Sequence, residues 1–146
     1  MKVCLDICCF DRPYDNQDHL SIKLETEAKL RMQEIIKEKK LLLIWSFMLD
    51  YENSANPGTS KRDSIYEWHD YSSAYISFKE DLLRLSQKIA DLGFGEKDSI
   101  HLSCAIAGKS EYFITVDNGL LYKSNCISDI KIIDPISFIR KMEETI

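Results

Sequence analysis

The sequence lacks any apolar run long enough to cross a membrane. Its longest, LLLIWSFML at 41–49, has nine residues, whereas a membrane-spanning helix needs about 20. A secretory signal is not expected either, because Asp6 interrupts the only apolar stretch near the start. We therefore expect a protein that does not associate with membranes and resides in the cytoplasm.

A regular cysteine pattern is also missing. The chain has five cysteines, an odd number, and none of them forms a C-x-x-C pair. Disulfide scaffolds and structural zinc sites use paired cysteines at regular spacings, so both classes are disfavoured. This cysteine usage is typical of a reduced compartment, in agreement with a cytoplasmic location.

There is no excess of positive charge. The formal net charge is −5 and the isoelectric point is about 5.2, which argues against a partner bound by bulk positive charge. Nucleic acid stays possible, because a bound divalent cation or a local basic rim also attracts phosphate. Nucleotide-binding and hydrolase motifs of the Walker A and G-x-S-x-G types are absent.

What the chain does contain is enough apolar sequence for a core. It has 146 residues, of which 45% are hydrophobic and 29% are charged, values typical of a soluble globular protein. No repeat, low-complexity stretch or linker divides it. We expect one domain over residues 1–146.

Short apolar runs alternate with segments of helical periodicity. We expect strands at 3–6, 41–45, 74–78, 112–115 and 130–133, and helices at 18–39, 46–56, 64–71, 77–92, 96–107, 118–123 and from 135 onward. Strands that alternate with helices predict a three-layer α/β/α sandwich with a mostly parallel central sheet.

Three helix features follow from the same patterns. The stripe that we expect to be buried on helix 18–39 is formed by Leu20, Leu24, Ala28, Met32 and Ile36. Ser77 and Glu80 match a capping box that would begin helix 77–92. Helix 96–107 has a face of mostly small residues suited to close packing on a sheet, formed by Ile100, Ser103, Cys104 and Ala107.

Four acidic residues occupy positions where strands end or helices begin. Asp6 ends the first strand, Asp117 follows strand 112–115, Asp98 is in the first turn of helix 96–107, and Glu52 lies nearly two turns after Ser46. Sites in open parallel sheets form beyond the carboxyl ends of the strands, so these side chains are expected to converge there.

Each acid has a simpler explanation when it is taken singly. Asp98 complements a helix N-terminus, Asp117 caps a helix, and Glu52 lies on a solvated helix face. Asp6 is the hardest to explain in this way, because aspartate is depleted in strands. Held together, the four carboxylates would repel one another unless a divalent cation such as Mg²⁺ or Mn²⁺ is bound.

These segments resemble the four signature segments of the PIN domain. The resemblance rests on V-C-L-D at Asp6, S-x-x-x-x-x-E from Ser46 to Glu52, KDSIHLSCA at Asp98 and ITVDNGLL at Asp117, in matching order and spacing over nearly the whole chain. The stretches LDICCFDRPYDNQ and GFGEKDSIHLSCA are similar to a bacterial subgroup, the VapC-type toxins of type II toxin–antitoxin pairs.

The resemblance implies a metal-dependent endoribonuclease that hydrolyses RNA phosphodiester bonds with Mg²⁺ or Mn²⁺. It further implies a homodimer and a cognate antitoxin protein as partner. The implied catalytic residues and metal ligands, direct or through water, are Asp6, Glu52, Asp98 and Asp117. Thr115 matches a threonine that orients the last acid. Ser46 matches the serine that opens the glutamate helix, as a hydrogen-bond donor or only as an N-cap.

The chain departs from many family members at two places. Ile7 and Cys8 follow the first acid where hydroxyl or amide side chains are common, and Gly119 stands where a further acid is common. We therefore expect one well-held metal ion, with a second only when substrate phosphate supplies ligands.

Further candidates lie near these segments. Arg12, Lys97 and Asn118 are candidate substrate-binding residues. His101, one turn after Asp98, could contact substrate or serve the structure alone. Two rival interpretations stay open: a PIN-like binding or scaffold protein with weak catalysis, and an unrelated α/β fold whose acids are only caps and lie dispersed.

Overall fold

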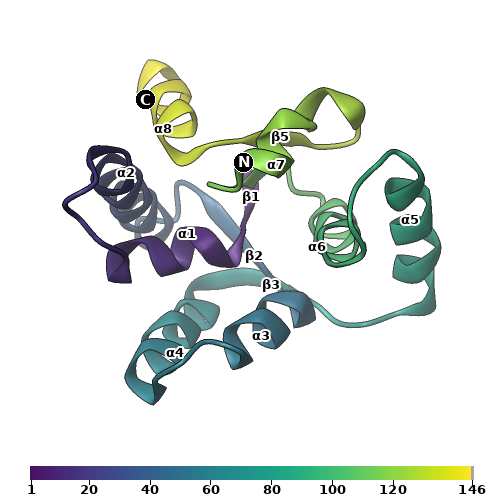
Figure 1. Ribbon diagram of the computed structural model, residues 1–146, viewed down its shortest axis with the longest axis horizontal. Coiled ribbons are helices and arrows are strands. Elements are labelled where there is room, and N and C mark those ends of the chain that lie inside the picture. Colours follow the sequence, from purple (N-terminus) through teal and green to yellow (C-terminus); the bar gives the residue numbers. More distant parts are fainter. Residues whose placement is uncertain (146) are drawn as a thin grey trace.

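The computed structural model describes residues 1–145 and is built on a five-stranded sheet (Figure 1). The strand order is β3-β2-β1-β4-β5, and every neighbouring pair is parallel. The strands are β1 (Lys2–Leu5), β2 (Leu42–Ser46), β3 (Ser72–Ile76), β4 (Tyr112–Ile114) and β5 (Lys131–Ile133). The predicted α/β/α class with a parallel sheet is confirmed.

Helices cover both faces of this sheet. They are α1 (Ile7–Asp11), α2 (Leu20–Lys37), α3 (Phe47–Ser54), α4 (Thr59–Tyr66), α5 (Glu80–Asp91), α6 (Glu96–Ala107), α7 (Asn118–Tyr122) and α8 (Pro135–Thr145), with 3₁₀ turns at Arg12–Tyr14, Glu67–Tyr71 and Ser124–Cys126. Figure 1 shows α1, α2 and α8 on one side of the sheet and α5 and α6 on the other. Among the described residues, no helix has both the length and the hydropathy that a bilayer crossing requires.

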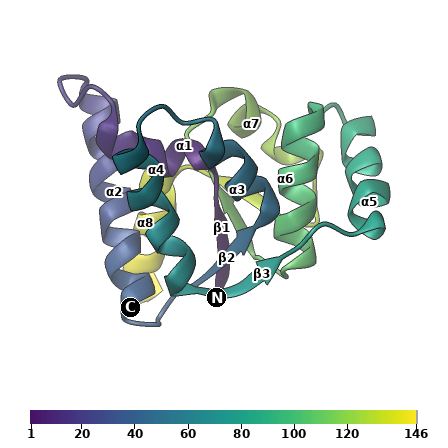
Figure 2. The same cartoon turned by 90° about the horizontal axis from the view of Figure 1, so that it is seen from below.

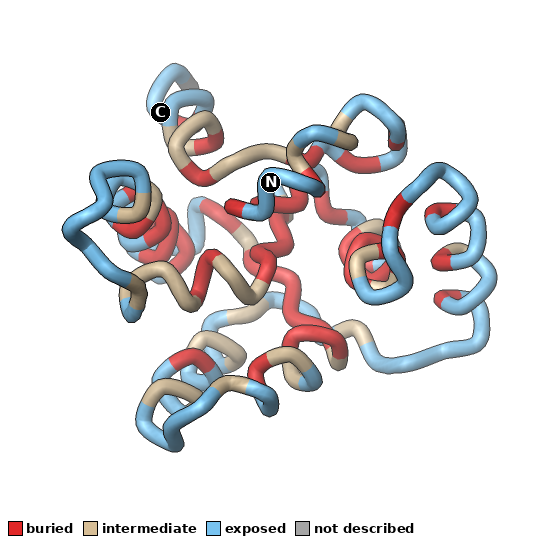
Figure 3. Tube along the Cα trace, viewed as in Figure 1, coloured by how far each residue is buried: buried red, intermediate tan, exposed pale blue. Residues whose placement is uncertain are grey.

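The core consists of two main layers separated by the sheet. Val3 and Leu5 of β1 pack with α1, α2 and α8, whereas Cys4 between them packs toward α5, α6 and α7. The central strands are buried along their length (Figure 3). Burial on both faces explains why they are continuous apolar runs without polar alternation.

The carboxyl ends of β1 and β4 lie side by side. Leu5 is in register with Ile114, and the Asp6 amide donates to the Ile114 carbonyl at 2.8 Å. In Figure 2, β1 runs from the N-terminus at the lower edge up to α1. The loops after these two strands therefore share one edge of the sheet.

Helix α2 buries only the C-terminal part of the predicted stripe. Ala28, Met32 and Ile36 are buried as expected, and Ile35 joins them, but Leu20 and Leu24 are 70% and 44% exposed. An 18-residue helix is about 27 Å long, whereas strands of four or five residues span about 13–17 Å. The first turns of α2 therefore lie beyond the sheet that would cover them.

Three further expectations need correction. The capping box is wrong: residues 77–79 lie outside any helix, and Lys79 is the N-cap of α5 without a side-chain hydrogen bond. In α6, Ala107 is exposed while residues 101–105 are buried, because α6 packs against both the sheet and α5. Helix α1 was not predicted, since the short run ICCF has no periodicity that distinguishes a helix from a strand.

Candidate metal centre

Asp6 is fixed by hydrogen bonds to both of its carboxylate oxygens. It follows β1 and caps α1, where Oδ1 accepts from the Ile7 amide at 2.8 Å. Oδ2 accepts from the Thr115 hydroxyl at 2.8 Å. The residue is 7% exposed, so its carboxylate is held at the sheet edge with little freedom to turn.

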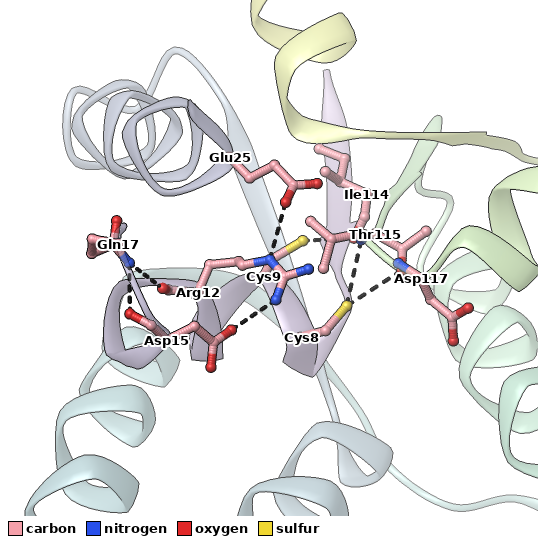
Figure 4. Close-up of polar contacts among 10 residues, drawn as sticks. Cys8, Cys9, Arg12, Asp15, Gln17, Glu25, Ile114, Thr115 and Asp117 are labelled. Atoms are coloured by element: carbon pink, nitrogen blue, oxygen red, sulfur yellow. Dashed lines mark hydrogen bonds and ion pairs between the residues drawn. The ribbon is translucent and has the colours of Figure 1, made fainter. Parts of the chain in front are cut away.

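Thr115 connects two of the four acids. Its hydroxyl donates to Asp6 and accepts from the Asp117 amide at 3.0 Å. The exposed side chain of Asp117 caps α7 by accepting from the Gly119 amide at 2.8 Å. Cys8 Sγ lies 3.4 Å from the same hydroxyl (Figure 4). Thr115 therefore sets the positions of Asp6 and Asp117 relative to each other.

Helix α3 carries Glu52 into the same region. Ser46, fully buried, begins this helix by accepting from the Leu49 amide at 3.3 Å, which is the N-cap role. Glu52 Oε1 then lies 3.1 Å from Nδ1 of His101 on α6. The two helices meet at this contact, which joins residues from distant parts of the chain.

His101 is the member of the site whose role the sequence left open. Its ring is 2% exposed, and Nδ1 also lies 3.6 Å from Asp6 Oδ1. On the other side of the ring, Nε2 faces Cys4 Sγ at 3.8 Å, and the Phe113 ring packs edge-on at 4.8 Å. The imidazole is thus held with Nδ1 directed at two carboxylates.

The four acids interact electrostatically. Burial, followed by the negative charges of Asp6, Asp117 and Glu52, raises the pKa of the Asp98 carboxyl. Burial favours the neutral ring of His101, but contacts with Cys4 and Glu52 and the charge of Asp6 outweigh it and raise the pKa of His101 well above its usual value. The site holds more negative charge than its one imidazole can balance.

The donor set suits a divalent cation. One ligand atom each from Asp6, Glu52 and His101 lie within 4.8 Å of one another. Carboxylate oxygens and imidazole nitrogens are common ligands of divalent metals in proteins. The residues present therefore fit a metal site.

Comparison with known proteins bears on the fold. The sequence matches no protein-family model and no curated protein sequence. Among solved structures it resembles a chain of VapBC2 from Rickettsia felis, bound to a DNA fragment from their promoter, with a TM-score of 0.57 and 15% sequence identity. The match covers 92% of this chain and 98% of that chain. The chain has a PIN-like α/β/α fold.

In this PIN-like fold the candidate substrate-binding residues lie in different settings. The Arg12 guanidinium contacts Asp15 at 2.8 Å and Glu25 at 3.1 Å, so two carboxylates of the chain already balance its charge (Figure 4). Lys97 is exposed, with Nζ 5.7 Å from the centre of the Tyr51 ring. Asn118 is exposed at the start of α7, directly after Asp117.

Proposed function

We propose that the protein is a metal-dependent endoribonuclease that hydrolyses RNA phosphodiester bonds. The observation that carries the proposal is that Asp6, Glu52 and Asp117 lie close enough to Asp98 for their negative charges to act on its carboxyl. Burial, followed by repulsion from the other three acids, raises the pKa of Asp98, a cost that a bound cation would offset. Carboxyl groups whose pKa is raised by burial and neighbouring charge cluster at functional sites.

The four acids are the proposed ligands of Mg²⁺ or Mn²⁺, directly or through water. When bound, the ion would supply charge stabilisation to a phosphodiester and favour ionisation of a water. Thr115 orients Asp6 and Asp117 through its two hydrogen bonds. Lys97 and Asn118, exposed beside Asp98 and Asp117, are the proposed contacts to substrate. Arg12 would join them only by exchanging an existing ion pair for phosphate.

The proposed setting is the toxin half of a type II toxin–antitoxin pair in the cytoplasm. The signature segments around the four acids support it, together with the fold likeness to a chain of VapBC2. A cognate antitoxin protein would bind the chain, and the active form would be a homodimer. A net charge of −5 makes RNA contact depend on the metal and a local basic rim rather than on bulk charge.

Thermal stability with and without Mn²⁺, measured alongside cleavage of RNA, tests the proposal. We expect Mn²⁺ to raise the melting temperature of wild type by mass action and to support cleavage, with both effects reduced in Asp98→Asn. The matched control is Asp129→Asn. It removes an exposed charge just before β5, at the amino ends of the strands and away from the four acids.

The outcomes separate the rival interpretations. Stabilisation by Mn²⁺ without RNA cleavage favours a binding or scaffold protein that keeps the metal. If Mn²⁺ changes nothing and Asp98→Asn behaves like Asp129→Asn, the metal site itself is refuted. Cleavage that persists in Asp98→Asn would remove that residue from the proposed machinery.

A further inference from the structure

We infer that His101 Nδ1 is a direct metal ligand beside Asp6 and Glu52, giving a mixed nitrogen and oxygen centre that favours divalent first-row transition ions over Mg²⁺. The inference rests on the metal site of the proposed function and adds to it a ligand and a class of ion. It concerns which metal is bound, and it does not depend on whether RNA is cleaved.

The first support is the spacing of the three ligand atoms. Nδ1 lies 3.1 Å from Glu52 Oε1 and 3.6 Å from Asp6 Oδ1. Two ligands held about 2.1 Å from one ion are roughly 3.0 Å apart at a right angle and roughly 3.4 Å apart at a tetrahedral angle. The observed spacings lie within about 0.2 Å of these values, so binding one ion requires only small shifts.

The second support is the way the ring is held. A metal-ligating imidazole usually directs its other nitrogen at a hydrogen-bond partner, which fixes the ring and its tautomer. Here Nε2 faces Cys4 Sγ at 3.8 Å, while Phe113 packs against the ring. A bound ion would displace the proton that Nδ1 directs at Glu52, while Nε2 keeps its proton on the side of Cys4, so the Nδ1 lone pair becomes available to the metal.

The third support is access. Glu52 and Asp98 are half-buried and Asp117 is exposed, whereas His101 and Asp6 are buried. The nitrogen thus lies on the inner side of the centre, whereas the more accessible carboxylates of Asp98 and Asp117 border solvent. That arrangement leaves outer positions for water or a phosphate oxygen.

The chemical consequence concerns ion selectivity. Mg²⁺ is a hard ion that takes oxygen ligands and gives up its water reluctantly, so an imidazole adds little to its binding. First-row transition ions accept imidazole nitrogen, with affinity rising from Mn²⁺ to Co²⁺. Replacing the imidazole should therefore weaken Mn²⁺ and Co²⁺ binding far more than Mg²⁺ binding.

Electron paramagnetic resonance of the Mn²⁺-loaded protein tests the ligation directly. Electron spin echo modulation detects a nitrogen bonded to Mn²⁺. We expect this nitrogen signal in wild type and in His19→Gln, a control at an exposed histidine, and its loss in His101→Gln. Calorimetric titrations should show Mn²⁺ and Co²⁺ affinity falling by roughly tenfold or more in His101→Gln, and Mg²⁺ affinity by much less.

The possible results are distinct. If Mn²⁺ binds wild type without a nitrogen signal, or if His101→Gln weakens all three ions equally, the inference is overturned while the carboxylate metal site stands. If wild type binds no Mn²⁺, the inference and the proposed metal site both fall. A nitrogen signal in a wild type that cleaves no RNA supports the inference and counts against the nuclease. The wild-type spectrum decides the matter even if His101→Gln does not fold.

Discussion

Charged side chains are buried or half-buried at both ends of the short helix α1, but the balance of charge differs between the two ends. Asp6, at the N-terminal end, lies among the acids of the candidate metal centre and contacts His101. Asp11, at the C-terminal end, pairs with Lys61 at 3.2 Å and interacts with the buried Lys29. The first group has an excess of negative charge, whereas the second combines charges of both signs.

This difference indicates which buried charges belong to a binding site. Lys29 is 5% exposed, and its Nζ lies 5.3 Å from the centre of the Phe10 ring, so a cation–π contact and Asp11 partly offset its burial. Among the described residues, the cation-forming side chain in contact with Asp6 and Glu52 is the imidazole of His101. Charge that the chain leaves uncompensated, rather than buried charge in general, indicates a ligand from outside.

The largest contrast is expected from neutralising the aspartate at each end of α1. Asp6→Asn keeps one acceptor oxygen, which can serve the Ile7 amide, but removes the charge and the second acceptor oxygen, so we expect Mn²⁺ affinity to fall by at least about 100-fold. Asp11→Asn should leave Mn²⁺ affinity unchanged. Isothermal titration calorimetry on both variants checks this, and equal losses would contradict the assignment of the metal centre to one end.

Removing the Thr115 hydroxyl should have the next largest effect. Thr115→Val leaves the Asp6 carboxylate and the Asp117 amide without their shared partner. We expect a loss of about 10- to 100-fold in Mn²⁺ affinity and about 1–3 kcal/mol of unfolding free energy. Thr115→Ser, which keeps the hydroxyl, should retain most of both quantities. Similar titrations for the two variants would show that the hydroxyl does not hold the metal ligands in place.

At the other end of α1, replacing Lys29 should stabilise the protein. Burial lowers the pKa of Lys29 to about 8, so the charged amine opposes folding at neutral pH. Lys29→Met should raise the unfolding free energy by about 1–3 kcal/mol at pH 7, measured by urea denaturation.

The pH dependence gives the sign of this effect. Between about pH 8 and 10.4 the unfolded chain holds the Lys29 proton more tightly than the folded chain, so wild-type stability rises with pH across this window. The advantage of Lys29→Met should be full below pH 8 and shrink toward pH 10. A variant less stable than wild type at pH 7 would mean that the cation–π contact and Asp11 outweigh burial.

The smallest predicted effect is on the metal-free protein. Burial and the neighbouring acids raise the pKa of Asp98, so its ionised form destabilises the fold once pH exceeds the unfolded value of about 3.9. Asp98→Asn should raise the metal-free melting temperature by roughly 1–3 °C at pH 7, a small gain because solvent screens a half-buried carboxylate.

Two conditions sharpen that measurement. The gain should vanish below about pH 4, where the carboxyl is protonated in both states, and Mn²⁺ should reverse the order by stabilising only wild type. Asp129→Asn should show neither change. A gain that persists in acid would assign the effect to packing rather than to charge.

The sequence was most informative where the relevant contacts are local. Asp6, Thr115 and Asp117 could be assigned to one sheet edge because each lies at or near the end of an apolar strand, and parallel strands bring their carboxyl ends together. The helix that carries Glu52 begins at Ser46, as its N-cap chemistry predicts. The α/β/α class followed from the same alternation of strands and helices.

Other features depended on contacts between distant segments. The contacts of His101 with Asp6 and Glu52 form only when α3, α6 and β1 pack together, and a histidine on a helix carries no local sign of them. Leu20 and Leu24 match a buried stripe, yet they are exposed because α2 is longer than the sheet. Arg12 lies in a segment that the sequence marks only as a polar loop. Its ion-pair partner Glu25 lies on a different element, helix α2.

The amino-acid sequence by itself thus determined the class of fold and the strand ends at which the acids gather, because hydrophobic period and turn chemistry are local properties. The tertiary structure alone decided that an imidazole stands among those acids and that the charge at the other end of α1 is compensated. Both depend on distances between side chains far apart in the chain, and only packing sets those distances.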